Sequence, residues 1–396
     1  MLSRSHSLLR TETTALFSGP FARVTIANFF FFLNFASFFL LPLYVKALGG
    51  SETTVGVVMG TGGAATFLTL PLVAVLIDRV GRRRFLMLGA IGMTAASICY
   101  LRVHTIGASL FALRVLQGAS FAAAFTATTA FAAALAPPSR RAQALGIFGL
   151  SVLLTHAIAP ATGEEIIRRL GFQALFCVTI GWTFVALLLA IGLPPGVVAP
   201  SAGPQPAAWH FDRLQWVVAV TMVLSGMGFG AMMTFAPTFI HGEELGRVGV
   251  FFAAYTTTAI LTRFMGAGLS DSFGRRAIIV PTLLVLAGSI ATMAFVRSIP
   301  ILVCAGALFG SAQGISYPTL HAFLVDMTAE AHLGRAQALF NGSFNLGVTS
   351  SAFIFGVAAE QFGYRPMFVL ASLTPLTACV LFFRYGVPTR TRRSRH

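Results

Sequence analysis

The sequence Asp78-Arg79-Val80-Gly81-Arg82-Arg83 returns in the second half of the chain as Asp271-Ser272-Phe273-Gly274-Arg275-Arg276. Each copy follows a long apolar run, and another apolar run begins directly after it. The glycine in each copy permits backbone angles that are closed to other residues, as a sharp turn requires. An arginine-rich turn between two membrane-length segments, present once in each half, predicts a duplicated membrane protein.

The composition also indicates a membrane protein. Of the 396 residues, 56% are hydrophobic and 10% are charged, whereas a soluble domain carries about 25% charged residues. A protein core cannot hide this much apolar surface, so lipid is the expected solvent. The net charge of +15 would suggest nucleic acid in a soluble protein. However, the arginines fall between apolar runs, and no basic domain or groove-reading motif accompanies them, so no nucleic-acid partner is expected.

The chain offers twelve segments of about the 20 apolar residues that one membrane crossing needs. We expect helices near residues 21–45, 53–77, 85–103, 107–134, 142–167, 172–193, 213–240, 246–269, 277–296, 299–325, 335–360 and 364–385. The break between the sixth and seventh segments is rich in Pro, Gly, Ala and Ser, as in a linker. The predicted organisation is a tail at 1–20, a six-helix bundle at 21–193, a cytoplasmic linker at 194–212, a second six-helix bundle at 213–385 and a basic tail at 386–396.

The two halves repeat beyond the arginine-rich turns. Arg141-Ala142-Gln143-Ala144-Leu145 answers Arg335-Ala336-Gln337-Ala338-Leu339, at an offset near 193 residues. Eighteen of the 27 lysines and arginines fall at the termini and in alternate loops, which the positive-inside bias places in the cytoplasm. The sequence therefore predicts an all-α protein of the bacterial inner membrane with both termini in the cytoplasm.

The two turns resemble the signature loop of the major facilitator superfamily, written loosely Gly-x-Leu-x-Asp-Arg-x-Gly-Arg-Arg. Ala74 and Ala267 replace its first glycine, and Ser272 replaces one arginine, but Asp-x-x-Gly-Arg-Arg is intact twice. The resemblance implies two pseudo-symmetric six-helix bundles that work by alternating access. It also implies a latch that grips the start of the helix at 335 when the cytoplasmic side is closed; a plain topology anchor is the alternative. The implied latch residues are Asp78, Arg79, Gly81, Arg82, Arg83, Asp271, Gly274, Arg275 and Arg276.

A second resemblance concerns coupling. Arg114-Val115-Leu116-Gln117-Gly118 is similar to the superfamily's Arg-x-x-Gln-Gly motif on helix 4, which is tied to proton coupling. A mid-membrane arginine is costly unless paired or hydrated; the alternative is a packing arginine bonded to backbone carbonyls. Ala159-Pro160-Ala161-Thr162-Gly163 loosely resembles the Gly-Pro-x-x-Gly-Gly motif of proton-coupled drug exporters. The coupling candidates are Arg114, His156, Glu164 and Arg263, with hydrogen-bonded packing as the alternative for His156 and snorkelling to the surface for Arg263.

In the superfamily, helices 1, 4, 7 and 10 line the cavity. The implied cavity residues are Asn34, Gln117, Gln313, Tyr317 and His321. Long phenylalanine runs, such as 29–32, are expected mainly against lipid.

No nucleotide-binding loop, zinc signature or catalytic constellation stands out, so we expect no enzyme, cofactor, metal site or ATP-driven pump. The favoured function is proton-coupled export of a small organic or amphiphilic compound by a monomer in the bilayer. Uptake of a small organic anion is the alternative, because Arg114 and Arg263 supply positive charge. A non-transporting sensor or assembly protein is less favoured, since it would need a large soluble appendage or a ruined latch.

Overall fold

The computed structural model describes residues 18–136, 140–194, 211–329 and 332–386, which are almost entirely helical. The first half contains α1 (Gly19–Ser37), a 3-10 turn η1 (Phe38–Leu40), α2 (Leu41–Ala47), α3 (Glu52–Val80), α4 (Arg82–Tyr100), α5 (Ala108–Leu135) and α6 (Arg141–Ile191). The second half contains α7 (Arg213–Gly242), α8 (Val248–Phe273), α9 (Arg275–Met293), α10 (Ile299–Asp326), α11 (Leu333–Phe362) and α12 (Tyr364–Tyr385).

The described helices provide twelve segments of membrane-spanning length. Ten helices in the described part of the chain are long and apolar enough to span a bilayer, with α1, η1 and α2 forming one of them. The 51-residue α6 turns at Gly171, whose φ is +84°, and therefore holds two crossings. The arginine-rich start of α4 lowers its mean hydropathy, but its 19 residues provide the twelfth. Such helices satisfy their own backbone hydrogen bonds, as lipid demands.

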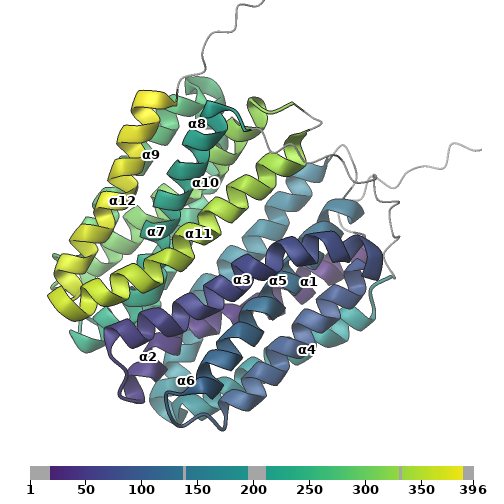
Figure 1. Ribbon diagram of the computed structural model, residues 1–396, viewed down its shortest axis with the longest axis vertical. Helices are drawn as coiled ribbons and strands as arrows, with labels where there is room; N and C mark the ends of the chain where they lie inside the picture. The colour runs from purple at the N-terminus through teal and green to yellow at the C-terminus, as the bar shows by residue number, and fades with distance from the viewer. Residues whose placement is uncertain (1–17, 137–139, 195–210, 330–331, 387–396) are drawn as a thin grey trace, which may run out of the picture.

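The helices form two bundles, α1–α6 and α7–α12 (Figure 1). Packing partners correspond between the bundles: α3 lies on α5 as α8 lies on α10, and α4 lies on α6 as α9 lies on α12. The bundles meet at two corresponding seams, where α3 runs beside α11 and α6 beside α8. This repetition confirms the all-α, pseudo-symmetric architecture that the sequence predicts.

Small residues allow the closest approach at the α3–α11 seam. A Cβ added at Gly56 would lie 2.2 Å from the carbonyl oxygen of Ala352 and 3.0 Å from the Cα of Gly356. Helices in lipid associate through such close packing, because lipid provides no hydrophobic force between them. The seam is therefore a direct contact of backbones.

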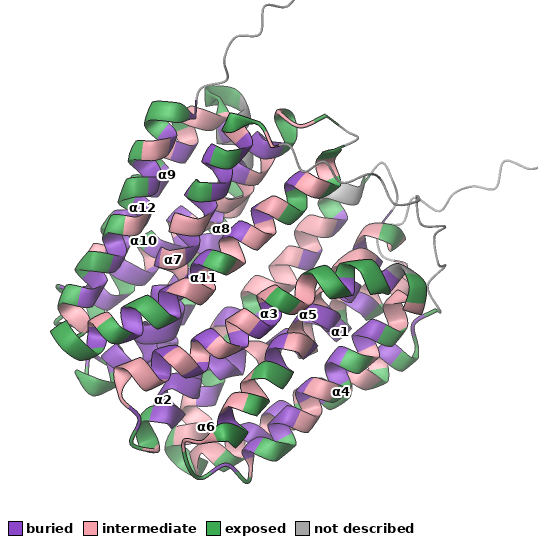
Figure 2. Ribbon diagram, in the orientation of Figure 1, coloured by how far each residue is buried: buried purple, intermediate pink, exposed green. Residues whose placement is uncertain are grey.

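Large apolar side chains cover the outside of the molecule. Along α4, α9 and α12, exposed positions alternate with buried ones (Figure 2). Leu88 of α4, Leu284 of α9 and Phe383 of α12 are 56%, 48% and 62% exposed. In water so much exposed apolar surface would drive aggregation, whereas in lipid it is the expected surface of an integral membrane protein.

Candidate functional site

A cavity of about 290 Å³ lies between the two bundles, with α1, η1, α3, α4, α5 and α6 on one side and α7 and α11 on the other. Eight phenylalanines dominate its wall: Phe32, Phe35, Phe38, Phe39, Phe121, Phe125, Phe229 and Phe344. Its polar lining residues are Thr66, Arg114, Gln117, His156, Thr234, Asn345 and Thr349. A larger hollow of about 960 Å³ lies beside Arg275, but the second bundle alone lines it. The cavity between the bundles is therefore the candidate site.

Arg114 projects from α5 against α3. Its Nε donates to the carbonyl of Val58 at 3.2 Å, its Nη2 to the carbonyl of Met59 at 3.4 Å, and its Nη1 to Oε1 of Gln117 at 2.9 Å. Gly62 permits this approach, because a Cβ there would lie 2.5 Å from Nη2 of Arg114. The backbone bonding expected as the alternative is thus present. Neutral acceptors hold the guanidinium, with no carboxylate against it among the described residues.

Gln117 has a fixed orientation beside this arginine. Its Oε1 accepts hydrogen bonds from Arg114 and, at 3.0 Å, from the hydroxyl of Tyr100. Its amide Nε2 is buried and has no partner within the described structure, and the side chain is only 3% exposed. A buried amide donor without a partner is costly, so this one is available to a group that enters the cavity.

His156 stands on α6 at the seam with α8. Its ring meets Phe39 edge-on at a centroid distance of 5.1 Å and stacks on Tyr255 of α8 at 6.2 Å. The side chain is 9% exposed, and its Nδ1 has no hydrogen-bond partner in the described part of the protein. The structure thus brings His156, Arg114 and Gln117 to one cavity.

The other predicted positions in the second bundle do not line this cavity. The Tyr317 hydroxyl donates to Asn341 at 3.1 Å, and His321 contacts the side-chain oxygen of Gln337. Gln313 has a buried Nε2 without a partner in the described residues. Arg263 of α8 lies beside α6, because a Cβ at position 149 would come within 3.5 Å of its Nη2. These residues lie along α8, α10 and α11, and the ring of Tyr317 meets that of the cavity-lining Phe344 at a centroid distance of 5.3 Å.

Asn34 lies in the core of the first bundle. Fully buried, it donates to the Ser97 hydroxyl at 3.0 Å and to the carbonyl of Thr179 at 2.9 Å. It thereby joins α1 to α4 and α6. The structure places it behind the cavity wall, where helix packing rather than substrate contact explains its amide.

Glu164 does not reach the cavity but bridges the two bundles at one end of the molecule. Its carboxylate accepts hydrogen bonds from the backbone N–H groups of Val248 and Gly249 at 2.9 and 2.8 Å. These are the first two residues of α8, whose N-cap, Arg247, makes no side-chain cap. A carboxylate at a helix N-terminus satisfies otherwise unpaired donors and complements the helix dipole. The first bundle thus caps a helix of the second.

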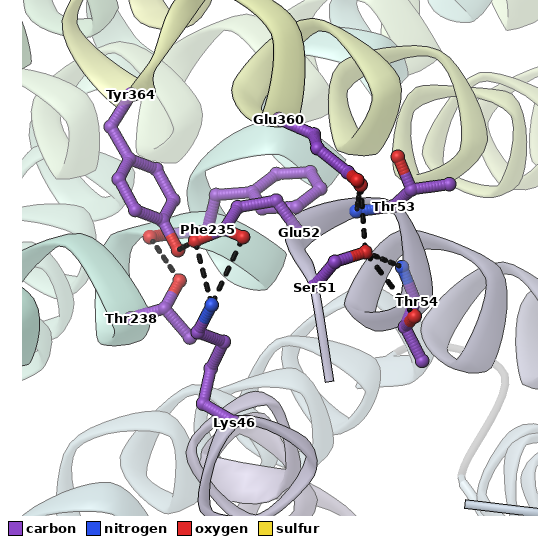
Figure 3. Close-up of polar contacts among 9 residues, drawn as sticks. All are labelled: Lys46, Ser51, Glu52, Thr53, Thr54, Phe235, Thr238, Glu360 and Tyr364. Atoms are coloured by element: carbon purple, nitrogen blue, oxygen red, sulfur yellow. Dashed lines mark hydrogen bonds and ion pairs between the residues drawn. The ribbon is translucent and has the colours of Figure 1, made fainter. Parts of the chain in front are cut away.

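Glu360 of α11 makes the corresponding contact in the opposite direction (Figure 3). Its Oε2 accepts from the hydroxyl of Ser51 at 2.7 Å and from the backbone N–H of Thr53 at 2.9 Å, at the start of α3. Beside it, the Tyr364 hydroxyl of α12 donates to Glu52 at 3.0 Å. We call the end of the molecule that carries Glu52, Glu164, Val248 and Glu360 the outer face, since the arginine distribution predicts it to be extracytoplasmic.

The two arginine-rich turns occupy the opposite face. Gly81 and Gly274 have φ angles of +98° and +85°, which agrees with the expected need for glycine. Arg275 donates to Asp326 at 3.1 Å, within the second bundle. The side chains of Asp78 and Asp271 lie outside the described residues, so the latch stays a prediction.

Comparisons with known proteins agree with this architecture. A model of the Major Facilitator Superfamily matches residues 24–246 and 218–396. The chain belongs to this superfamily. It is therefore a membrane transporter and not an enzyme.

Relatives align over nearly the whole chain. The multi-drug resistance efflux pump PmrA of Streptococcus pneumoniae is 25% identical over 391 residues, covering 90% of this chain and 94% of its own. The staphylopine export protein of Staphylococcus aureus is 21% identical over 382 residues, covering 92% and 95%. The crystal structure of the nucleoside transporter NupG superposes with a TM-score of 0.76 at 13% identity, covering 94% of this chain and 100% of that chain.

Sequence reasoning missed part of the site. The expectation that phenylalanines 29–32 face lipid is wrong for Phe31 and Phe32, which are 0% and 3% exposed, and Phe32 lines the cavity. Glu360 was not singled out, although it lies three residues before Gly363 and Glu164 lies seven residues before Gly171. The sequence signal that could have identified this pair is a carboxylate near the outer end of each of two corresponding helices.

Proposed function

We propose that this transporter exports a small organic compound across the bacterial cytoplasmic membrane by alternating access, driven by the proton gradient. The observation that carries the proposal is an aromatic cavity between two bundles whose outer ends are joined by carboxylate caps. Two relatives are named for efflux and for export. Export in this superfamily member then requires the outer contacts to break and the cavity to open outwards.

Direction and coupling are tested together in inside-out membrane vesicles. With a proton gradient imposed, vesicles that contain the protein should accumulate a fluorescent amphiphile, and a protonophore should abolish the accumulation. Vesicles without the protein are the control. Equal accumulation in the two preparations would reject export, and accumulation only in right-side-out vesicles would support uptake.

His156 is the best-placed group to carry the proton, because it lines the cavity and an imidazole can both accept and release a proton. Replacing His156 by Asn should lower proton-driven flux at least about tenfold, since general proton-transfer roles contribute factors of this size or more. Substrate counterflow without a pH gradient should remain. His241→Asn, at the exposed outer end of α7, is the matched control. Full gradient-driven flux in the His156 variant would remove this residue from the coupling step.

The latch remains part of the proposed cycle at the cytoplasmic face. Asp78→Asn should impair transport and leave membrane insertion intact, because a neutral amide loses the charge that a helix N-terminus favours. Asp271→Asn should do less harm, since Ser272 has replaced the second charge of that loop. Initial rates of vesicle uptake, normalised to protein content, measure the difference. Parental rates in the Asp78 variant would remove the latch from the cycle.

A further inference from the structure

Among the described residues, the cavity lining carries a positive charge and no negative charge. Arg114 is the permanently charged residue among the described side chains that line it. The described carboxylates lie towards the two faces of the molecule, with Glu52, Glu164, Glu165, Glu243, Glu244 and Glu360 near the outer face and Asp212 and Asp326 near the opposite face. A cation surrounded by apolar groups is costly without a counter-ion. The described cavity thus has a positive charge that its own lining does not neutralise.

The unused hydrogen-bond donors gather on the same wall. A guanidinium has five N–H groups, and three of those on Arg114 are directed at Val58, Met59 and Gln117. Two donors of Arg114 remain, and Arg114 and Gln117 both line the cavity. The bonds from Tyr100 and Arg114 to Oε1 of Gln117 hold its unpaired Nε2 in place. Arginine favours planar oxyanions such as carboxylates because its fork of N–H groups matches them.

The rest of the cavity suits an apolar body. Eight phenylalanines surround a space of about 290 Å³, and ligand pockets generally combine such apolar walls with a few polar anchors. Resting on the proposed transport function, we infer that the substrate is a small amphiphilic monoanion, with its carboxylate or similar oxyanion at Arg114 and Gln117 and its apolar part among the phenylalanines. An organic cation meets like charge at Arg114 and is disfavoured.

Three labelled probes of similar shape test the inference by equilibrium binding to the full-length protein in lipid nanodiscs. They are 1-naphthoate, the neutral 1-naphthamide and the cationic 1-naphthylmethylammonium. We expect naphthoate to bind at least about tenfold more tightly than the amide, as one charge-assisted pair provides, and the cation to bind most weakly. Arg114→Gln should remove the preference for naphthoate and leave amide binding unchanged.

Two further variants keep this test decisive. Arg297→Gln removes an exposed arginine that does not line the cavity, so naphthoate should bind to this variant as to the parent. Arg114→Lys keeps the charge and should retain part of the preference. It is the substitute if the glutamine variant is not monodisperse.

The inference would be overturned if the parent bound naphthoate and the amide equally, bound the cation more tightly, or bound none of the probes. It would also be overturned if the Arg114→Gln variant kept the preference for naphthoate. Binding needs no gradient, so anion selectivity without proton-driven export would overturn the proposed function alone. Proton-driven export without anion selectivity would overturn the inference alone.

Discussion

Replacing Glu164 and Glu360 together by glutamine should release the outer face. Each carboxylate accepts two hydrogen bonds at the start of a helix in the other bundle, and hydrogen bonds to charged groups are stronger than those between neutral groups. Glutamine keeps one acceptor but loses the charge that the helix N-terminus favours. We expect a loss of about 1–2 kcal/mol at the half-buried Glu164, and a further loss at the exposed Glu360. The two sites share no partner, so their effects should add, and the change at Glu164 alone should shift the population about fivefold or more towards the open outer face.

Cysteine labelling measures this shift. A Thr349→Cys substitution on the cavity wall, made after replacing the four native cysteines, should react slowly with an impermeant maleimide added from outside. The double glutamine variant should react at least about fivefold faster, in proportion to the open population. Glu243→Gln is the matched control, because Glu243 pairs at 2.8 Å with Arg365 of its own bundle. Unchanged labelling in the double variant would show that the caps do not hold the outer face closed.

The substitution Gly56→Ala should open the same face through a steric clash. In Gly56→Ala the new Cβ would meet the Ala352 carbonyl at 2.2 Å, and a backbone atom on a packed helix cannot swing aside. Overpacking of this kind costs about 1–3 kcal/mol. The strain lies between the bundles and not within one, so separation of α3 from α11 relieves it. We expect the open population to rise about five- to a hundredfold while each bundle stays folded.

The distance between spin labels on the outer ends of α3 and α11 reports this opening directly. Gly181→Ala on α6 is the matched control, since nothing lies within 4 Å of a Cβ there and the parental distance distribution should persist. Combined with the double glutamine variant, Gly56→Ala should add little once the face is open. A Gly56→Ala variant with the parental distribution and parental transport would contradict the close seam.

The fold and the superfamily could be predicted because their signals are local. These signals are the arginine-rich turns and the motif Arg114-Val115-Leu116-Gln117-Gly118. The hydrogen-bond partners of Arg114 could not be predicted from such local signals. Its partners Val58 and Met59 belong to a helix about fifty residues earlier, and backbone carbonyls have no side-chain signature. Phe32 shows the same limit, since a phenylalanine facing lipid and one facing a cavity are identical in sequence.

The sequence by itself determined the membrane location, the crossings and the duplication. Lipid leaves unpaired backbone groups no partner, so a long apolar run must become a helix wherever it packs. Tertiary structure alone decided which polar residues meet. It placed Asn34 in the core, Arg114, Gln117 and His156 at one cavity, and Glu164 and Glu360 at the outer seams. These outcomes depend on how each helix is rotated against helices distant in the chain, and close packing of small residues such as Gly56 and Gly62 sets that rotation.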